Sequence, residues 1–330
     1  MYILYYIIMK TDFSVYLEKK FKNNNLILNT KNLDELYNNF DEVYSNLTKE
    51  FLDNYEREDI KFNGYHNYKK TTLFSDKTTI TINYNNQVVK LNIYHNNDTI
   101  DNFINTILLV IYFMIEYSNY NTDILIDYLL TDELKIINDF ETNKIFTKQE
   151  INSGLTDFRK NKIIIWRKEE IMKVTIHELI HLLHLGIKKT SSKLINHYKK
   201  KYKVSSDNII LDEAYTEFLA VLINSFLITK FTNNNFNYFK YLLKLEIYFS
   251  IFQSKKILYL SRKNQNDYIH INNYTQVLSY FIIKLELFMN LEEVIKIINL
   301  KNLKDLENLL INFKKTVLNN SIIVDLDTQL

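Results

Sequence analysis

The chain contains no cysteine, no proline, three glycines and two alanines among its 330 residues. The absence of cysteine excludes disulfide bonds, thiolate zinc ligands and a cysteine nucleophile, so any metal must be held by nitrogen and oxygen atoms. Because proline and glycine are scarce, asparagine, with 43 copies, must mark the turns. Residues with AT-rich codons are enriched and those with GC-rich codons are depleted, which indicates an AT-rich genome and not a function.

The chain also lacks a strong charge of either sign. Its 41 basic and 39 acidic side chains are spread along the sequence and give a net charge of +2. No polybasic field therefore favours nucleic acid or an anionic membrane as a partner. The 46% apolar and 14% aromatic content is enough for a buried core, so we expect a globular protein.

Long hydrophobic runs are absent as well. The opening "MYILYYIIMK" is apolar for nine residues and lacks both a basic leader and a small-residue cleavage site, so we expect a buried strand and not a signal peptide. The run at 107–118 is interrupted by Glu116 and is predicted to be a core helix. We expect no transmembrane segment and an intracellular protein.

Periodicity predicts a mixed first half. Apolar residues recur every three or four positions over 33–55 and 99–118, which predicts two helices. Residues 78–95 alternate on both sides of Asn85 and Asn86, as in a hairpin turned by a dipeptide that tolerates positive φ. A short apolar stretch (123–130), a polar loop (152–157) and a strand (162–166) follow.

The second half is predicted to be mainly helical, at 209–229, 235–253, 273–289, 291–299 and 302–318. A mixed half followed by a helical half predicts an α+β architecture. We expect two regions, an N-terminal α/β region of unknown role at 1–98 and a second domain at 99–330.

The segment "VTIHELIHLLHLG" at 174–186 carries most of the recognisable chemistry. His177 and His181 are four residues apart, so on a helix both imidazoles lie on one face and can close on one ion. Glu178 lies about 100° round the helix, where its carboxylate could take a proton from a metal-bound water. This is the H-E-x-x-H arrangement of zinc hydrolases. The alternative is a set of histidines that hydrogen bonds satisfy without a metal.

A hydrolytic zinc usually has three protein ligands, so a third is needed. His184 is seven residues from His177, a rise of about 10.5 Å, and an unbroken helix cannot bring both to one ion. We expect His184 to pack or hydrogen-bond beneath the site. Metzincin peptidases place a third histidine six residues after the second, but Ile187 occupies that position here, which excludes this class.

The segment "LDEAYTEFLAVL" at 211–222 resembles the second motif of gluzincin peptidases, the thermolysin-like group. The resemblance implies that Glu213 is the third zinc ligand and that Glu217 accepts the far N–H of His177, as acids behind metal ligands generally do. Asp212 is the alternative ligand. The separation between the motifs implies an inserted loop at 187–208, which contains the basic "HYKKKYK".

The same resemblance extends to the flanking segments. The strand "KIIIW" (162–166) looks like the edge strand that pairs with an extended peptide substrate in gluzincins. "NSGLTD" (152–157) either lines the same cleft or is simply a turn. In this family a downstream His or Tyr stabilises the oxyanion, and His270, ahead of Tyr274 and Tyr280, is our candidate for that catalytic role.

The two motifs together also look like predicted metallopeptidases of large DNA viruses, which share the AT-rich composition. This resemblance covers residues 120–290 and implies a viral protein of the host cytoplasm or the virion. The resemblances together imply a zincin-like core with a small mixed sheet and an active-site helix. They also imply a zinc-dependent peptidase that acts on peptide or protein substrates. The alternatives are a catalytically inactive, zinc-stabilised protein of the same fold and a zinc hydrolase of non-peptide bonds.

Overall fold

A computed structural model describes residues 15–16, 19, 28, 31–96, 100–135, 146–187, 189–204, 206–261 and 275–313. These residues fall into two compact units. The first unit contains the described residues between 40 and 135 and between 152 and 185, and the second contains those between 15 and 39, between 146 and 151 and between 186 and 313. The expected strand at 1–10 lies outside the described residues.

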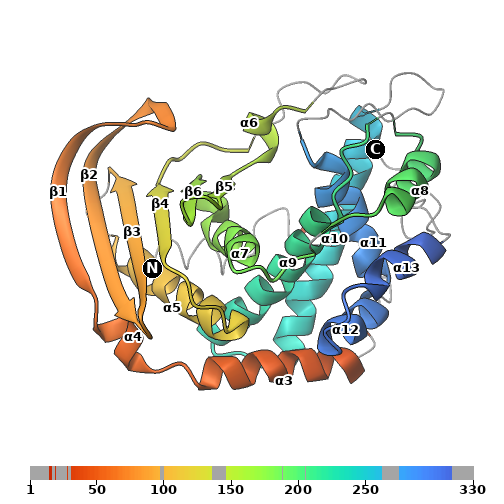
Figure 1. Ribbon diagram of the computed structural model, residues 1–330, viewed down its shortest axis with the longest axis horizontal. Helices are drawn as coiled ribbons and strands as arrows, with labels where there is room; N and C mark the ends of the chain where they lie inside the picture. The colour runs from red at the N-terminus through yellow and green to blue at the C-terminus, as the bar shows by residue number, and fades with distance from the viewer. Residues whose placement is uncertain are drawn as a thin grey trace. The chain divides into compact units, whose positions relative to one another are not determined.

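The first unit is built on one six-stranded mixed sheet with the order β1-β2-β3-β4-β6-β5 (Figure 1). Its strands are β1 Glu56–His66, β2 Lys69–Tyr84, β3 Gln87–His95, β4 Ile124–Leu129, β5 Gly154–Asp157 and β6 Lys162–Trp166. β3, β4 and β6 run parallel, while β1, β2 and β5 pair with their neighbours in antiparallel fashion. The sheet continues across the boundary expected at residue 98, because β3 pairs with β4.

The β2–β3 hairpin confirms the sequence prediction. Asn85 and Asn86 both have positive φ, 48° and 62°, as a two-residue turn of type I′ requires. The register pairs Ile80 with Leu91, and Ile82 with Val89, so one face of both strands is buried. Asparagine therefore performs the turn function for which most chains use glycine.

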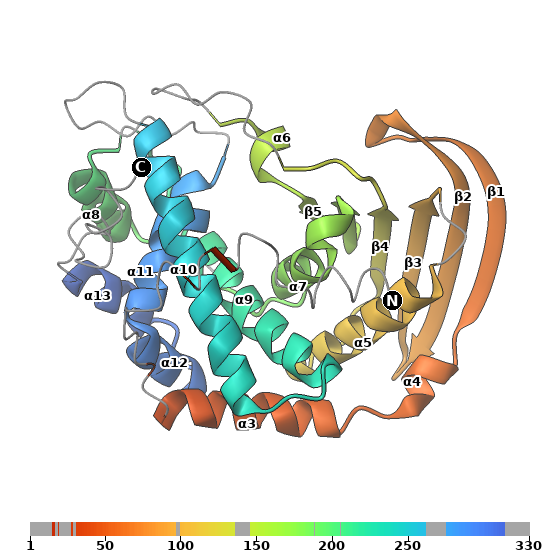
Figure 2. The ribbon, with the colours of Figure 1, turned by 180° about the vertical axis from the view of Figure 1, so that it is seen from behind.

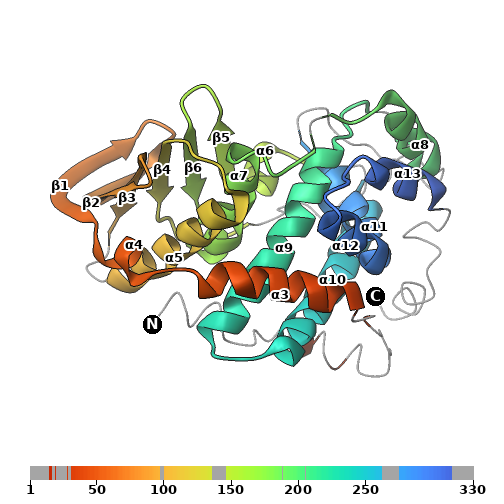
Figure 3. The ribbon, with the colours of Figure 1, turned by 60° about the horizontal axis from the view of Figure 1, so that its bottom comes forward.

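Helices α5 (Asp101–Ser118) and α7 (Ile171–Leu182) lie side by side on one face of the sheet (Figure 3). α5 provides the crossover that joins parallel strands β3 and β4. Tyr128 of β4 ties the layers together, because its ring packs edge-on against Phe103 and its hydroxyl lies 3.1 Å from Thr175 Oγ1. The predicted core helix over 107–118 is confirmed, since most of its residues are buried.

The helix predicted over 33–55 is interrupted. α3 (Lys31–Ser45) ends before Asn46, and a short α4 (Lys49–Asp53) follows. The backbone N–H of Thr48 donates to Tyr112 Oη at 3.2 Å, so a tertiary hydrogen bond replaces helical pairing at the break. Periodicity alone does not reveal such a partner.

The second unit is helical, as expected. α9 (Leu211–Phe231) and α10 (Phe236–Leu260) pack along each other, and both contact the π-helical turn η2 (Leu278–Ile283) and α11 (Lys284–Met289) (Figure 2). The other helices of this unit are the four-residue α6 (Lys148–Ile151), α8 (Ser192–Tyr202), α12 (Leu291–Asn299) and α13 (Asp305–Asn312). A six-stranded mixed sheet together with many helices confirms the α+β class.

The loop predicted at 187–208 is wrong, because residues Ser192–Tyr202 form α8. The basic segment within it is anchored by a buried acid. Glu286 of α11 accepts a hydrogen bond from Tyr198 Oη at 2.7 Å and pairs with Lys201 Nζ at 2.8 Å. The sequence suggests a loop here because the apolar stripe of α8 is short and the acid that anchors it lies more than 80 residues away.

Among the described helices, α9 alone is long and apolar enough to cross a membrane. Most of its apolar window is buried inside the structure, as in the core helix of a globular protein. The length and apolar composition of α9 are therefore explained by its packing inside the structure.

Candidate metal centre

His177 and His181 both lie on α7, which begins directly after β6 and the short 3₁₀ turn η1 (Lys168–Glu170). Their ring centroids are 4.9 Å apart and the ring planes cross at 74°. His177 is buried and His181 is partly buried. The four-residue spacing therefore places two imidazoles on one helix face, as the sequence predicts.

Glu178, the predicted base, is held by the edge strand β5. Thr156 Oγ1 donates to Glu178 Oε2 at 2.6 Å. Gly154 lies so close that a Cβ at this position would be 2.5 Å from Glu178 Oε1 and 2.7 Å from Val174 Cγ1. Only glycine therefore fits beside the carboxylate without displacing it.

The residues that surround Glu178 correct two sequence predictions. The loop predicted over 152–157 is wrong, because Gly154–Asp157 form β5. The prediction that 162–166 is the edge strand is also wrong, since β6 lies between β4 and β5. Three apolar β-branched residues dominate β6, as in a strand buried on both faces, whereas the polar β5 reads as a turn. Gly154 is one of only three glycines in the chain, and its presence was the available sequence signal for the role of β5.

α9 carries the predicted second motif near its N-terminus. Glu213 is partly buried and Glu217 is buried. The alternative ligand Asp212 has a structural role, because its Oδ1 accepts the N–H of Ile187 at 2.6 Å. A Cβ on Gly186 would lie 2.1 Å from the same oxygen, so this carboxylate is fixed against the backbone.

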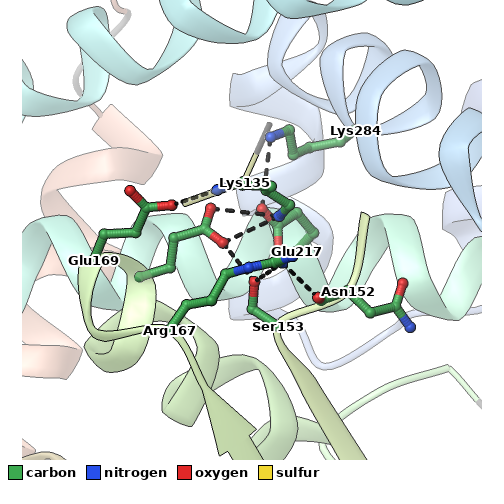
Figure 4. Close-up of polar contacts among 8 residues, drawn as sticks. Lys135, Asn152, Ser153, Arg167, Glu169, Glu217 and Lys284 are labelled. Atoms are coloured by element: carbon green, nitrogen blue, oxygen red, sulfur yellow. Dashed lines mark hydrogen bonds and ion pairs between the residues drawn. The ribbon is translucent and has the colours of Figure 1, made fainter. Parts of the chain in front are cut away.

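Glu217 has a partner that the sequence analysis missed. Lys284 Nζ lies 3.7 Å from Glu217 Oε1, and both side chains are almost entirely buried (Figure 4). The opposite charge offsets part of the cost of burying either group alone. A lysine within the apolar run "YFIIKLELF" was the signal in the sequence. The hydrogen bond from His177 to Glu217 stays a prediction.

His177, His181 and Glu213 form a group that could hold a metal ion. Each offers one ligand atom, and these atoms all lie within 4.8 Å of one another. Glu178 and Asp212 are not members of the group. Two imidazole nitrogens and one carboxylate oxygen thus meet in the part of the chain that the structure describes.

His184 packs, as expected, and its ring contacts are with two aromatic side chains outside α7. The helix ends at Leu182, and His184 has left-handed backbone geometry with a φ of 55°. Its exposed ring stacks on Phe158, with centroids 6.2 Å apart, and meets Tyr120 edge-on at 5.3 Å. The helix end turns His184 away from the stripe that an unbroken helix would continue.

The candidates for oxyanion stabilisation are only partly visible. His270 and Tyr274 lie outside the described residues. Tyr280 is part of η2 and packs against the cluster of Phe146, Ile151 and neighbouring apolar side chains. The roles of all three stay predictions.

A polar network fixes the backbone in front of α7 (Figure 4). Arg167 has a φ of 81°, and its buried guanidinium donates to Asn152 O at 2.7 Å and to Ser153 Oγ at 3.1 Å. Ser153 Oγ donates to Glu170 Oε2 at 2.8 Å, and Glu170 pairs with Lys135 at 3.1 Å. The start of β5 is thereby tied to the residues that begin α7.

The charges in this network shift one pKa strongly. Burial by itself would raise the pKa of Glu170, but the positive charges of Lys135 and Lys173 and the hydrogen bond from Ser153 outweigh it. Together they lower the pKa of Glu170 to about 2. Glu170 is therefore ionised throughout the physiological pH range.

Comparison with known proteins shows a distant viral relative. The chain is 29% identical over 157 residues to the uncharacterized protein R210 of Acanthamoeba polyphaga mimivirus. The match covers 43% of this chain and 40% of that protein, so the chain spans less than half the length of its curated relative. No family model matches the chain, and no solved structure matches it significantly. A viral relative agrees with the viral setting that the sequence resemblance implies.

Proposed function

We propose that this protein is a zinc-dependent peptidase of the gluzincin type with a zincin-like catalytic core. One observation carries the proposal: the ligand atoms of His177, His181 and Glu213 lie within 4.8 Å of one another. These are the three residues that the two sequence motifs select independently of any coordinates. A match between a motif and a spatial cluster is stronger support than either alone.

The donor set suits zinc better than the other common cations. Two neutral imidazoles and one carboxylate are a familiar catalytic zinc set with a fourth position left for water, whereas calcium and magnesium prefer oxygen alone. Tetrahedral ligands at about 2.0–2.2 Å from an ion lie about 3.4 Å apart, which is within the 4.8 Å limit of this group. When bound, zinc would supply Lewis acidity, which lowers the pKa of water and polarises a carbonyl.

Glu178 is the residue that would move the proton. Thr156 fixes one carboxylate oxygen, and the bare Cα of Gly154 leaves room for the other. In the proposed reaction Glu178 accepts a proton from the attacking water and then passes it to the leaving amine, while the water oxygen bonds to the carbonyl carbon and the C–N bond breaks. A fixed carboxylate next to the histidine pair supports this role.

The edge of the sheet supports a peptide as the substrate. β5 is the last strand in the sheet order, and no described strand pairs with its far side. An extended peptide could add to this edge by main-chain hydrogen bonds, and Glu178 lies against the same strand. β5, not β6, is therefore the proposed substrate-pairing strand.

Metal analysis of the purified protein tests the ligand set. We expect one zinc per chain in the wild type and much less than one in His181→Ala. His184→Ala is the matched control, because this histidine is exposed and outside the ligand group, and it should keep the full zinc content. Equal zinc in His181→Ala and the wild type would refute the site.

A peptide library, read by mass spectrometry, tests the chemistry. Glu178→Gln should keep one zinc and lose at least about 100-fold in kcat, the usual contribution of a general base. Glu169→Gln, at an exposed glutamate nine residues earlier, should cleave as the wild type does. Bound zinc without any cleavage by the wild type would favour the inactive, metal-stabilised alternative. Wild-type cleavage by Glu178→Gln would refute the base.

A further inference from the structure

The turn between β1 and β2 presents one tyrosine to solvent. Tyr68 lies between His66, the last residue of β1, and Lys69, the first residue of β2. Its side chain is 45% exposed. The N-terminal strands have no motif that explains an exposed aromatic residue at this turn.

The turn is tied to the sheet and is not a free loop. The backbone N–H of Tyr68 donates to His66 Nδ1 at 3.2 Å, so the His66 proton is on Nε2 and is donated to Asp127 Oδ2 at 3.1 Å. Asp127 is 2% exposed on β4. Lys69 forms an ion pair with Glu133. Tyr68 is therefore held in place by one anchored residue on each side, His66 before it and Lys69 after it.

The anchor itself is fixed by further charges. Lys162 Nζ lies 2.5 Å from Asp127 Oδ2, and Asn92 Nδ2 donates to Asp127 Oδ1 at 2.8 Å. Burial alone would raise the pKa of Asp127, but hydrogen bonds from His66, Lys162 and Asn92 lower it. The ionised carboxylate thus joins four strands at one point.

Tyr68 is held over Trp166, the last residue of β6. Their ring centroids are 5.0 Å apart with the planes tilted by 41°. The backbone N–H of Trp166 donates to Ser153 O at 2.9 Å, and Ser153 directly precedes β5. The Tyr68 ring therefore lies next to the start of the proposed substrate-pairing strand.

In this position the Tyr68 hydroxyl is influenced by the negative charge of Glu178, the proposed base. Gly154, the first residue of β5, places no side chain of its own against Glu178. Burial of the hydroxyl raises the pKa of Tyr68, and the negative charge of Glu178 raises it further. The phenol consequently stays protonated at neutral pH and can donate a hydrogen bond.

We infer that Tyr68 is a substrate-binding residue, whose hydroxyl donates to a backbone carbonyl of a peptide that extends along β5. The inference rests on the proposed peptidase function and adds to it a residue from the N-terminal strands. Those strands thereby acquire a role, since their turn carries a side chain onto Trp166 of β6, the strand that pairs with β5. Trp166 forms the rigid support beneath this side chain.

Kinetics with a peptide that the library identifies test the inference. Tyr68→Phe should raise KM about five- to tenfold and change kcat less than threefold, because one neutral hydrogen bond to the bound substrate is lost. Tyr65→Phe is the matched control, since Tyr65 lies on β1 of the same hairpin and is 55% exposed. A Tyr68→Phe enzyme with wild-type KM would overturn the inference and leave the peptidase proposal intact.

Trp166 provides a second measurement that needs no turnover, because it is the only tryptophan in the chain. The zinc-loaded Glu178→Gln protein is titrated with the identified peptide or, if the wild type cleaves nothing, with a mixture of random decapeptides. Binding of the peptide should change Trp166 emission. Introducing Tyr68→Phe into the same protein should weaken peptide binding about five- to tenfold. If binding depends on Tyr68 in this way but the wild type cleaves no peptide, the peptidase function is removed and Tyr68 remains a peptide contact. Unchanged emission would overturn the inference.

Discussion

Thr156 and Gly154 show how much a site depends on residues that hold no metal. They stand two apart on β5, so both face α7, where one donates to Glu178 and the other makes room for it. The alternation of a strand is thus used to orient a carboxylate. This arrangement explains the position of Glu178 without any metal.

Thr156 therefore gives a prediction at the scale of one residue. Thr156→Val keeps the shape but removes the donor to Glu178, and we expect kcat to fall about tenfold with unchanged zinc content. Thr156→Ser keeps the hydroxyl and should retain most of the activity. Peptide cleavage rates and metal analysis of both variants provide the measurement. Equal rates for valine and threonine would mean that the hydrogen bond does not orient the base.

The connection between β6 and α7 is the element on which the site depends. Arg167 has unusual backbone geometry there, and its buried guanidinium satisfies the backbone at Asn152. Non-glycine residues with positive φ persist only where surrounding contacts fix them. The network around Glu170 supplies such contacts, because Glu170 joins Ser153 before β5 to Lys135 after β4.

This network predicts a pH dependence of stability. The pKa of Glu170 is about 2 in the folded protein, below its ordinary value of 4.5, so its stabilisation is present above about pH 4.5 and disappears as the pH falls toward 2. The side chain is 24% exposed, and screening limits the effect to about 1–2 kcal/mol.

Urea unfolding of the wild type and of Glu170→Gln, from pH 7 to pH 2.5, measures this contribution. The wild type should be more stable at pH 7, and the difference between the two proteins should shrink steadily below pH 4.5. Lys135→Met should reproduce part of the loss at pH 7. A difference that is constant with pH would show that Glu170 contributes by packing and not by charge.

At the scale of the whole molecule, the metal group joins residues that are far apart in the chain. His181 and Glu213 are separated by 32 positions, and a ligand that binds only the folded state stabilises it by mass action. Zinc at about 1,000 times its Kd would contribute about 4 kcal/mol. The folded protein should therefore become measurably more heat-resistant when zinc is added.

Thermal unfolding with and without zinc tests this effect. The apo protein should gain several degrees in Tm on adding zinc, and chelation should reverse the gain. Calcium should give no comparable shift, since the donor set contains two imidazoles. The His181→Ala protein should not respond to zinc, and a full response in that variant would contradict the assigned group.

The sequence predicts the parts of the site that are governed by local spacing. The histidine pair follows from a four-residue period, and the β2–β3 turn follows from two asparagines that tolerate positive φ. The order of the strands does not follow from the sequence. The apolar β6 lies inside the sheet and β5 lies at its edge, whereas the sequence analysis took β6 to be the edge strand. Position in the sheet is a tertiary property that a five-residue pattern does not encode.

Partners at long sequence separation account for the other failures. α8 depends on Glu286, more than 80 residues away, and Glu217 pairs with Lys284, 67 residues away. Tyr68 is one of 25 tyrosines, and nothing in its neighbourhood distinguishes it until Trp166 and Asp127 are brought beside the β1–β2 turn. Such pairings depend on the topology of the whole chain and not on any local pattern.

The bare Cα of Gly154 has an evolutionary consequence. A genome that drifts toward A and T erodes glycine codons, and this chain has only three glycines. A single G-to-A change that turns this glycine codon into a serine or arginine codon would place a Cβ against the Glu178 carboxylate while leaving both histidines untouched. In the proposed chemistry, one nucleotide substitution at this codon is therefore enough to give a diverging copy that still holds zinc and no longer cleaves peptides.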